Sequence, residues 1–323
     1  MRGFLRALPL PIHHQLLWYR ITGVLGEGGF GITYAAVDTN LHHHVAIKEY
    51  FPRSMCARDT MLDVRVRNDG SIPSYDWGLR RFIDEARTLA HFRHPNIVQV
   101  RTAFEKNQTA YMVMDLERGM TLDSAYKAGR FTTEDEILAT VGPLLHGLAQ
   151  VHTAGFIHRD IKLENIILRS DGTPVLVDFG SARQVLGADE GGLTALVTRG
   201  YAPFEQYASD DGPLDPGPWC DIYSLAAALY VLITRRMPPD ALSRAARLTA
   251  GADDPLIRAQ SLASAQFSPE LLTAVDHGLA FRSDARPRSI EGWLAAQREI
   301  WERRLDRLER RGIDLTAGLS RGS

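Results

Sequence analysis

The chain has 323 residues, of which 45% are hydrophobic and 24% are charged, and this composition predicts a folded protein of one or two compact units. Its 37 Lys and Arg against 39 Asp and Glu give a formal net charge of −2, so no overall field favours nucleic acid or an anionic membrane as a partner. The sparse cysteines, Cys56 and Cys220, argue against a disulfide framework and favour a reducing compartment, the cytoplasm.

The N-terminal segment, residues 1–18, begins MRGFLRALPLPIHH, in which two prolines interrupt an apolar run that is too short for a secretory signal. We expect this segment to be an extended lead-in to the folded part. The longest apolar stretch, IYSLAAALYVLI, is shorter than the roughly 20 residues that cross a bilayer. It predicts a buried core helix, and direct insertion into a membrane is not expected.

The region 19–116 mainly predicts β-strands. The stretches YRITGVLG, GITYAAVD and HHVAIKEY are rich in β-branched or aromatic residues, and IVQVRTAF and TAYMVMDL predict two further strands. One helix interrupts them, because Phe82, Ala86 and Leu89 recur at helical spacing and the breaker HPN follows. The pattern indicates an antiparallel meander with one main helix.

The region 117–302 mainly predicts α-helices. A helical stripe of apolar residues between Ile137 and Val151 ends at Gly155. The fold class is therefore α+β, with a β-rich N-terminal lobe and a mainly helical C-terminal lobe. Further helices are expected around 221–234, 269–281 and 288–310.

Two stretches carry no sustained period. The segment from Tyr50 to Tyr75 mixes Pro, Arg, Asp, Asn, Gly and Ser, and it predicts a surface excursion between the third strand and the first helix. The sequence gives no indication of its role. The stretch 303–323 contains the end of the last helix and a tail that we expect to be poorly ordered.

The motif GEGGFG, residues 26–31, lies between two predicted strands. Glycines let backbone amides close over phosphate groups, although a tight hairpin without a ligand is the simpler interpretation. A strand follows the motif instead of a helix, so a dinucleotide-binding fingerprint is disfavoured. By itself the motif is weak support for nucleotide binding.

The motif VAIK sets Lys48 on a predicted strand between apolar neighbours. An ammonium group in such surroundings is expected to seek an anion, although most lysines simply face solvent. Glu85, on the predicted helix, would supply one partner and the phosphates of a nucleotide would supply another. Such a pair would link the strand to the helix.

The stretch HRDIKLENIIL, residues 158–168, clusters costly polar side chains beside an apolar run. A carboxylate (Asp160), a nearby cation (Lys162) and a carboxamide (Asn165) are the groups that transfer of a phosphoryl group to a hydroxyl needs. In VLVDFGSAR, an apolar strand ends at Asp178, whose carboxylate would hold Mg²⁺. The two stretches together predict phosphoryl transfer.

With these motifs in order along the chain, the sequence resembles a eukaryotic-type protein kinase, over roughly residues 19–301. The signature set is the glycine-rich loop, the strand lysine, the catalytic loop and DFG. The resemblance implies a bilobal protein-kinase fold. The wording GEGGFGITY, KEYFP and GYAPFEQY is most similar to bacterial members of the family.

The resemblance implies a role for each charged residue of the motifs. Asp160 would be the catalytic base that accepts the proton of the substrate hydroxyl, and Lys162 would stabilise the transferring phosphoryl group. Lys48 would hold the α- and β-phosphates of ATP, and Glu85 would fix Lys48. The metal, Mg²⁺ with Mn²⁺ as the alternative, would be bound by Asn165 and Asp178.

The resemblance also assigns the residues around the nucleotide, with Met114 at the gatekeeper position and Asp115–Leu116 at the hinge. Thr33 departs from the valine that is usual at its position, which slightly alters the adenine roof. The full set that would bind the nucleotide is Leu25, Gly26, Glu27, Gly28, Gly29, Phe30, Gly31, Thr33, Ala46, Lys48, Met114, Asp115, Leu116 and Ile167.

Two further contacts follow from the resemblance, and both carry stability instead of chemistry. Glu205 would pair with Arg286, which closes the C-terminal lobe. Asp221 would anchor the catalytic loop from a central helix.

The segment between Asp178 and Glu205 corresponds to the activation segment. Its threonines are Thr194 and Thr198, and Thr198 aligns with the threonine that faces the substrate. We therefore expect autophosphorylation at Thr194, whose phosphate would pair with Arg159. An ordinary exposed-loop threonine is the alternative.

The function that the resemblance implies is a serine/threonine protein kinase, because tyrosine kinases usually lack a lysine at the position of Lys162. It would act on protein substrates with ATP, and no nucleic-acid partner is expected. The oligomeric state stays open. One alternative is a pseudokinase scaffold, which would not need the retained catalytic residues. Another is a small-molecule kinase, a group that generally lacks the activation segment.

Overall fold

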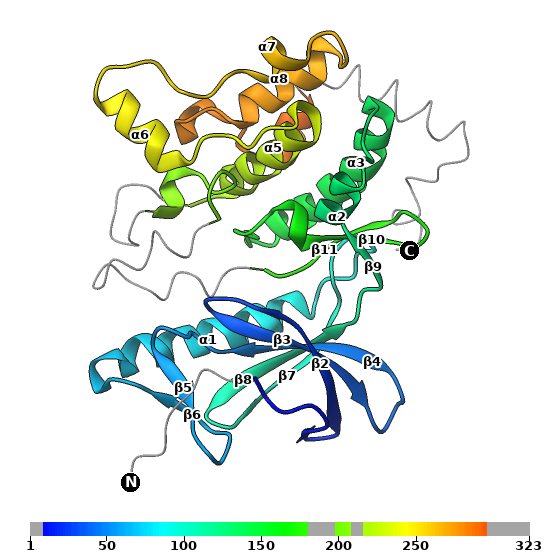
Figure 1. The fold of residues 1–323 in the computed structure, drawn as a ribbon, viewed down its shortest axis with the longest axis vertical. Helices are drawn as coiled ribbons and strands as arrows, with labels where there is room; N and C mark the ends of the chain where they lie inside the picture. Colours follow the sequence, from blue (N-terminus) through cyan, green and yellow to red (C-terminus); the bar gives the residue numbers. More distant parts are fainter. Residues whose placement is uncertain (1–8, 180–197, 208–215, 296–323) are drawn as a thin grey trace. The chain divides into compact units, whose positions relative to one another are not determined.

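The computed structural model describes residues 9–179, 198–207 and 216–295, and the chain forms two compact units (Figure 1). The first unit contains residues 9–93 and 98–117. The second contains residues 94–97 and the described residues from 118 onward. A β-rich first unit with one long helix and a mainly helical second unit confirm the α+β class that the sequence predicts.

The first unit is built on an antiparallel six-stranded sheet with the order β1-β2-β3-β4-β8-β7 (Figure 1). Its strands alternate in burial, as a sheet covered mainly on one face does: on β3 the side chains of Ile32, Tyr34 and Ala36 are fully buried and their neighbours are half-buried. The strands are β1 (Gln15–Leu16), β2 (Tyr19–Glu27), β3 (Gly31–Asp38), β4 (His44–Tyr50), β7 (Val100–Lys106) and β8 (Thr109–Asp115).

Helix α1 (Ile72–Leu89) packs against β7 and β8 of this sheet (Figure 1). Proline in its first turn loses no hydrogen bond, because the N–H groups of a first helical turn have no partner within the helix. Phe82, Ala86 and Leu89 are buried, which confirms the stripe predicted from their spacing. The ring of Tyr50, at the end of β4, lies 5.9 Å from the ring of Phe82, so the helix covers the sheet face that carries Tyr50.

The segment from 50 to 75 contains a hairpin of β5 (Cys56–Arg58) and β6 (Val64–Val66). All residues of β5 are buried, so the prediction of a surface excursion is wrong in this part. Arg58 is only 4% exposed, and its guanidinium lies 2.6 Å from Oε2 of Glu49 on β4. Tyr34 and Tyr111 donate hydroxyl hydrogen bonds to the same carboxylate. The hairpin escaped prediction because polar partners, and not an apolar period, attach it to the sheet.

The N-terminal segment is attached to the sheet as well. Strand β1 pairs with β2, and the backbone N–H of Leu10 donates to the Tyr34 hydroxyl at 3.0 Å. Leu10 and Leu16 are buried. Residues 10–16 are therefore packed into the first unit. The sequence predicted only an extended lead-in, without these contacts.

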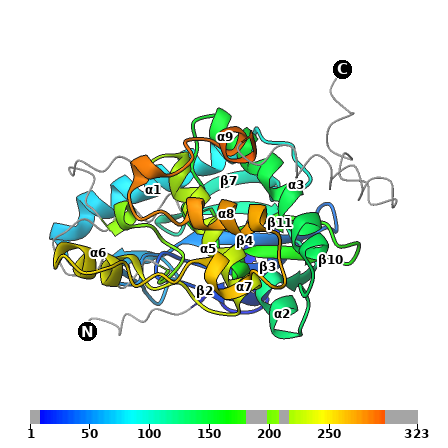
Figure 2. The ribbon, with the colours of Figure 1, turned by 90° about the horizontal axis from the view of Figure 1, so that it is seen from above.

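The second unit is built around α3 (Glu134–Thr153) and α5 (Pro218–Thr234). A capping box between Thr133 and Glu136 starts α3, and α5 is buried along nearly its whole length, as expected of the longest apolar run. Helix α5 lies beside α8 (Pro269–Gly278) and α7 (Ala259–Ala263) (Figure 2). The predicted helices around 221–234 and 269–281 are thus confirmed as α5 and α8.

The smaller elements complete the second unit. A three-stranded antiparallel sheet has the order β11-β10-β9. Among the described residues, the other elements are β9 (Gly119–Thr121), β10 (Ile166–Arg169), β11 (Pro174–Leu176), α2 (Leu122–Lys127), α6 (Ala241–Thr249), α9 (Ile290–Ala295), and the 3-10 helices η1 (Asp69–Ser71, in the first unit), η2 (Leu163–Asn165), η5 (Phe204–Tyr207) and η6 (Ser283–Ala285). Residues from 296 onward, which include most of the helix expected at 288–310, lie outside the described residues.

None of the helices in the described part of the chain combines the length and the apolar character that a membrane span requires.

Candidate active site

Asp221, on α5, holds the loop that begins at His158. Its fully buried carboxylate accepts backbone N–H hydrogen bonds from His158 at 2.7 Å and from Arg159 at 2.8 Å. The Nε2 atom of His152 lies 2.8 Å from the same carboxylate. The anchor predicted for Asp221 is confirmed by these contacts. The contribution of His152 was missed, because a single histidine on a helix gives no sequence signal.

The electrostatics of this anchor keep Asp221 charged. Burial alone would raise its pKa, but the hydrogen bond with His152 and the backbone N–H of Arg159 together hold the pKa of the carboxyl below its ordinary value. A carboxylate that accepts several hydrogen bonds is stabilised in its ionised form. The loop that begins at His158 is therefore held by the buried, ionised carboxylate of Asp221.

Asp160 is 5% exposed and is held from both of its carboxylate oxygens. Oδ2 accepts from Nδ2 of Asn165 at 2.7 Å and lies 3.0 Å from Nζ of Lys162. Oδ1 accepts from the hydroxyl of Thr198 at 2.9 Å. The structure thus brings together three residues of the predicted catalytic loop and fixes the direction of the carboxylate, which is what a general base requires.

The His158 side chain contacts the backbone of both Asp160 and Val177. The backbone N–H of Asp160 donates to Nδ1 at 3.2 Å, and Nε2 lies 3.1 Å from the carbonyl oxygen of Val177. Because an N–H can only donate and a carbonyl can only accept, this assigns a neutral ring with its proton on Nε2. The ring also packs on Phe179, with 4.3 Å between centroids. His158 thereby links the loop of Asp160 to the stretch that follows β11.

Asn165 ends η2 and joins the same two segments. Its Nδ2 donates to both the backbone oxygen and Oδ2 of Asp160, and its own backbone oxygen accepts from the N–H of Val177 at 2.9 Å. With the amide nitrogen committed to Asp160, the oxygen Oδ1 is the atom left to face a cation. An amide oxygen with the carboxylate of Asp178 is the hard-oxygen donor set that Mg²⁺ prefers. The residues present therefore fit this metal.

Two residues of the site have left-handed backbone conformations. Arg159 has φ 67° and Asp178 has φ 59°. Residues other than glycine rarely adopt this region, although aspartate does so more readily than most. Such conformations cluster at functional sites, where the surrounding contacts hold them. Next to these residues, the Arg159 N–H is bonded to Asp221, and the N–H of Val177, which precedes Asp178, donates to the Asn165 oxygen.

The predicted nucleotide residues of the first unit lie on neighbouring strands. Ala46 and Lys48 point to the same face of β4, and their cross-strand partners on β8 are Met114 and Met112. Thr33 on β3 is the other partner of Lys48. This face is partly open, since Lys48 and Thr33 are half-buried. Glu85 is 2% exposed on α1.

The glycine-rich hairpin, residues 26–31, joins β2 to β3. The N–H of Gly28 donates to the Gly31 oxygen at 2.9 Å, so the turn is tight. A β-carbon on Gly31 would lie 2.4 Å from the backbone oxygen of Glu49, whereas one on Gly26 would meet nothing within 4 Å. Gly31 is thus required by strand packing, and Gly26 has no such requirement.

The remaining predicted nucleotide residues differ in exposure. Leu25 on β2 is 53% exposed, and Ile167 on β10 is half-buried in the second unit. At the predicted hinge, the side chain of Asp115 forms an ion pair with Arg101, and its backbone N–H donates to the Gln99 oxygen at 3.0 Å. The side chain and the backbone N–H of Asp115 are thus both engaged within the first unit.

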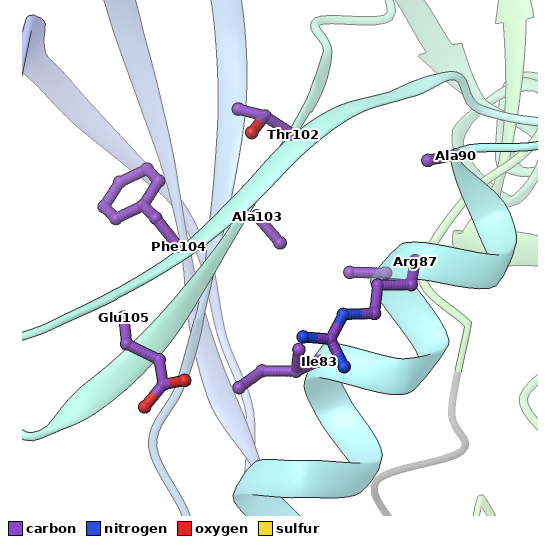
Figure 3. Close-up of a pocket in the computed structure, with 8 residues that line it drawn as sticks. Ile83, Arg87, Ala90, Thr102, Ala103, Phe104 and Glu105 are labelled. Carbon is purple, nitrogen blue, oxygen red and sulfur yellow. The ribbon is translucent and has the colours of Figure 1, made fainter.

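A shallow groove of about 210 Å³ lies between α1 and β7 of the first unit (Figure 3). It is lined by apolar and charged side chains, and none of the predicted site residues is among them. Its lining residues are Ile83, Ala86, Arg87, Ala90, Thr102, Ala103, Phe104 and Glu105.

Glu205 and Arg286 form the predicted ion pair. Both side chains are buried, and the guanidinium approaches the two carboxylate oxygens at 2.5 and 3.3 Å. Arg286 also donates to the backbone oxygens of Ala280 and Phe281. The pair is thus fully hydrogen-bonded, as a buried ion pair must be. The predicted phosphosite, Thr194, lies outside the described residues.

Comparisons with known proteins all identify protein kinases as similar to this chain. The family profile described as "Protein kinase domain" matches residues 19–289. "Serine/threonine-protein kinase C" of Synechocystis sp. is 35% identical over 234 residues, which are 68% of this chain and 39% of the relative. "Serine/threonine-protein kinase PknL" of Mycobacterium tuberculosis is 30% identical over 221 residues, which are 68% of this chain and 50% of the relative.

A solved structure described as "PpkA-294 apo form" superposes with a TM-score of 0.75 at 36% sequence identity, covering 90% of this chain and 99% of that one. By contrast, the chain spans half or less of the length of the two curated relatives.

Proposed function

Because this chain belongs to the protein kinase family, we propose that it transfers the γ-phosphoryl group of ATP to serine or threonine side chains of proteins. The observation that carries the proposal is the carboxylate of Asp160, held by Lys162, Asn165 and Thr198 in a loop that is fixed on Asp221. Such an oriented base beside a cation is costly to maintain and has no evident structural purpose.

In the proposed reaction, Asp160 accepts the proton of the substrate hydroxyl while the hydroxyl oxygen forms a bond to the γ-phosphorus. The bond from that phosphorus to the bridging oxygen breaks, and ADP leaves. Lys162, 3.0 Å from Asp160, lies where its charge offsets the negative charge of the transferring group. Bound Mg²⁺ would neutralise phosphate charge, with Asn165 and Asp178 as its ligands.

On the nucleotide side, we assign Lys48 to the α- and β-phosphates and Glu85 to the positioning of Lys48. The burial of Glu85 supports this role, since a buried carboxylate needs a cation or several donors. The face of β4 that carries the buried Ala46 and the half-buried Lys48 suits an adenine and its phosphates. The glycine-rich hairpin would close over the phosphates.

The finer assignments extend this proposal. Residues 19–116 and 117–302 are the two lobes, and ATP with Mg²⁺ or Mn²⁺ is the co-substrate. Lys162 favours serine and threonine over tyrosine as the acceptor. Autophosphorylation at Thr194 would activate the enzyme through Arg159. The two cysteines are not bonded to each other, which suits the cytoplasm.

The test is incubation of the purified chain with γ-labelled ATP, Mg²⁺ and a mixed protein substrate, followed by phosphoamino-acid analysis. Labelled phosphoserine or phosphothreonine that disappears in Asp160→Asn is the expected result. Nucleotide binding without any transfer would indicate a pseudokinase scaffold, and label found only on a small metabolite would indicate a small-molecule kinase. For Thr194, full activity of Thr194→Ala and a protein without phosphate on this loop would remove the proposed activation.

A further inference from the structure

Two backbone hydrogen bonds tie the tip of the glycine-rich hairpin to the segment that follows β4. The N–H of Phe51 donates to the oxygen of Phe30 at 2.9 Å, and the N–H of Arg53 donates to the oxygen of Gly29 at 3.0 Å. The two acceptor residues, Gly29 and Phe30, lie at the turn of the hairpin. These two bonds continue the contact between the hairpin and the chain after β4 beyond the last cross-strand pair, Gly31 with Tyr50.

An ion pair reinforces the same connection. The guanidinium of Arg53 contacts the carboxylate of Glu27, which lies in the glycine-rich hairpin. The side chains are 33% and 38% exposed, so solvent screens the pair in part. An ion pair of this exposure makes a small contribution to stability. Together with the two backbone bonds, it connects three of the hairpin's residues to residues 51–53.

The segment on the far side of this connection is firmly packed. Phe51 is fully buried, and the guanidinium of Arg58 lies 5.0 Å from its ring centroid. The carbonyl oxygen of Pro52 accepts from the N–H groups of Met55 and Cys56, both at 3.0 Å. Proline also restricts the backbone of the residue before it. Residues 51–53 thus form a rigid support.

The glycine-rich hairpin, in contrast, has open space around two of its glycines. A β-carbon on Gly26 would meet nothing within 4 Å, and one on Gly28 would meet only the Gly31 oxygen at 3.8 Å. Leu25 and Val24, which lead into it, are 53% and 41% exposed. The bonds to residues 51–53 therefore add to the pairing of β2 with β3 in setting the position of the hairpin tip.

We propose that Arg53 is a positioning residue that latches the glycine-rich hairpin in place through Glu27, and so prepares it to bind the phosphates of a nucleotide. The inference rests on the proposed kinase function for the identity of the ligand. Arg53 acts through the hairpin and not on the reacting atoms. Loss of the latch therefore weakens nucleotide binding and leaves the transfer step unchanged.

The expected effect is small but measurable. Arg53→Ala raises the Kd for a fluorescent ATP analogue with Mg²⁺, and the KM for ATP, by about two- to fivefold, the fold-change of a partly exposed ion pair. The kcat changes by less than about twofold. Arg53→Lys keeps a cation opposite Glu27 and recovers most of the affinity. The matched control is Arg65→Ala, which breaks an exposed ion pair to Asp59 in the same segment.

Hydrogen exchange tests the latch without any nucleotide. The reporters are the amides of Phe51 and Arg53, which donate to the hairpin, and the amides of Met55 and Cys56 serve as internal controls. In the nucleotide-free protein, Arg53→Ala speeds exchange at residues 51 and 53 and leaves residues 55 and 56 unchanged. Equal exchange in the variant and the parent chain would overturn the proposal.

A charge swap completes the test. The double variant Glu27→Arg with Arg53→Glu restores the slow exchange that either single change loses in the nucleotide-free protein, because the pair is re-formed with reversed sign. Single changes that speed exchange additively, without recovery in the swap, would overturn the latch. If the parent chain binds ATP and Arg53→Ala binds it equally well, the latch fails and the kinase proposal stands. If the parent chain binds no nucleotide, both fail.

Discussion

The hydroxyl of Thr198 donates a hydrogen bond to Oδ1 of Asp160 at 2.9 Å. The two residues are 38 positions apart in the sequence. The contact leaves Asp160 with a donor on each carboxylate oxygen, since Asn165 donates to Oδ2. The orientation of the proposed base therefore depends on where the stretch beginning at Thr198 lies.

Thr198→Ala removes this donor, and we expect it to lower kcat about 10- to 100-fold. A hydrogen bond to a charged group contributes about 1.5–3 kcal/mol, which corresponds to that range of rates. Steady-state kinetics with a protein substrate measures the change. Thr198→Ser keeps the hydroxyl and should retain most of the activity. An alanine variant with the parent kcat would show that Asp160 is positioned without Thr198.

The anchor at Asp221 predicts a change in acid stability. Its pKa is lowered in the folded chain from an ordinary value of 3.8, so the ionised carboxylate stabilises the fold. This contribution is fully present above about pH 4 and is lost as the pH falls through the lower folded pKa. Asp221→Asn should lose about 3–5 kcal/mol at pH 7 and show a flatter loss of stability below pH 4. Urea unfolding between pH 2.5 and 7 measures both, and an unchanged acid slope would contradict the anchor.

Local sequence patterns predicted most strands of the sheet from their β-branched and aromatic residues, α1 from its helical period and α5 from its continuous apolar run. The burial of Phe82, Ala86 and Leu89 follows from their spacing alone. The catalytic loop was recognisable for a different reason: polar groups crowd beside an apolar run, where packing does not explain them. The family resemblance then assigned Asp221 and the pair of Glu205 with Arg286, which no local pattern indicates.

The remaining features depend on contacts between polar groups that are distant in sequence. The β5–β6 hairpin is attached through Arg58 and Glu49, and both residues resemble ordinary surface charges in the sequence. The same is true of Arg53 and Glu27. Periodicity reports the burial of apolar side chains and carries no information on which charges pair. Such contacts become visible only once the strands are in register.

The buried pair of Glu205 and Arg286 predicts a large loss of stability when it is broken. Arg286→Leu leaves the carboxylate buried without its cation, which should cost about 3–5 kcal/mol in the free energy of unfolding. Adding Glu205→Gln should recover part of this loss, because the uncompensated charge is removed. Chemical denaturation measures the two effects. Arg282→Ala, at an exposed ion pair with Asp284, is the control and should leave the midpoint nearly unchanged.

The Arg58 contact makes the reactivity of Cys56 a reporter of the β5–β6 hairpin. Burial raises the pKa of the Cys56 thiol to about 12, so at pH 8 the native protein should react very slowly with a thiol reagent. Arg58→Met removes the cation that attaches the hairpin to Glu49, and labelling of Cys56 should become faster. Peptide mapping after labelling identifies the site. Cys220, buried in the second unit, is the internal control. Equal labelling of Cys56 in Arg58→Met and in the parent chain would contradict the attachment.

The glycines of the hairpin should separate folding from ligand binding. A β-carbon on Gly31 would lie 2.4 Å from the Glu49 backbone oxygen, so Gly31→Ala must displace β3 from β4 and should lower the unfolding midpoint of the ligand-free chain. A β-carbon on Gly28 would have only a 3.8 Å contact, so Gly28→Ala should unfold at nearly the parent temperature. If the backbone there approaches phosphates, Gly28→Ala should still weaken binding of MgATP, and the stabilisation that MgATP gives in a thermal melt should shrink. Equal stabilisation by MgATP in Gly28→Ala and the parent chain would show that this backbone does not lie against the nucleotide.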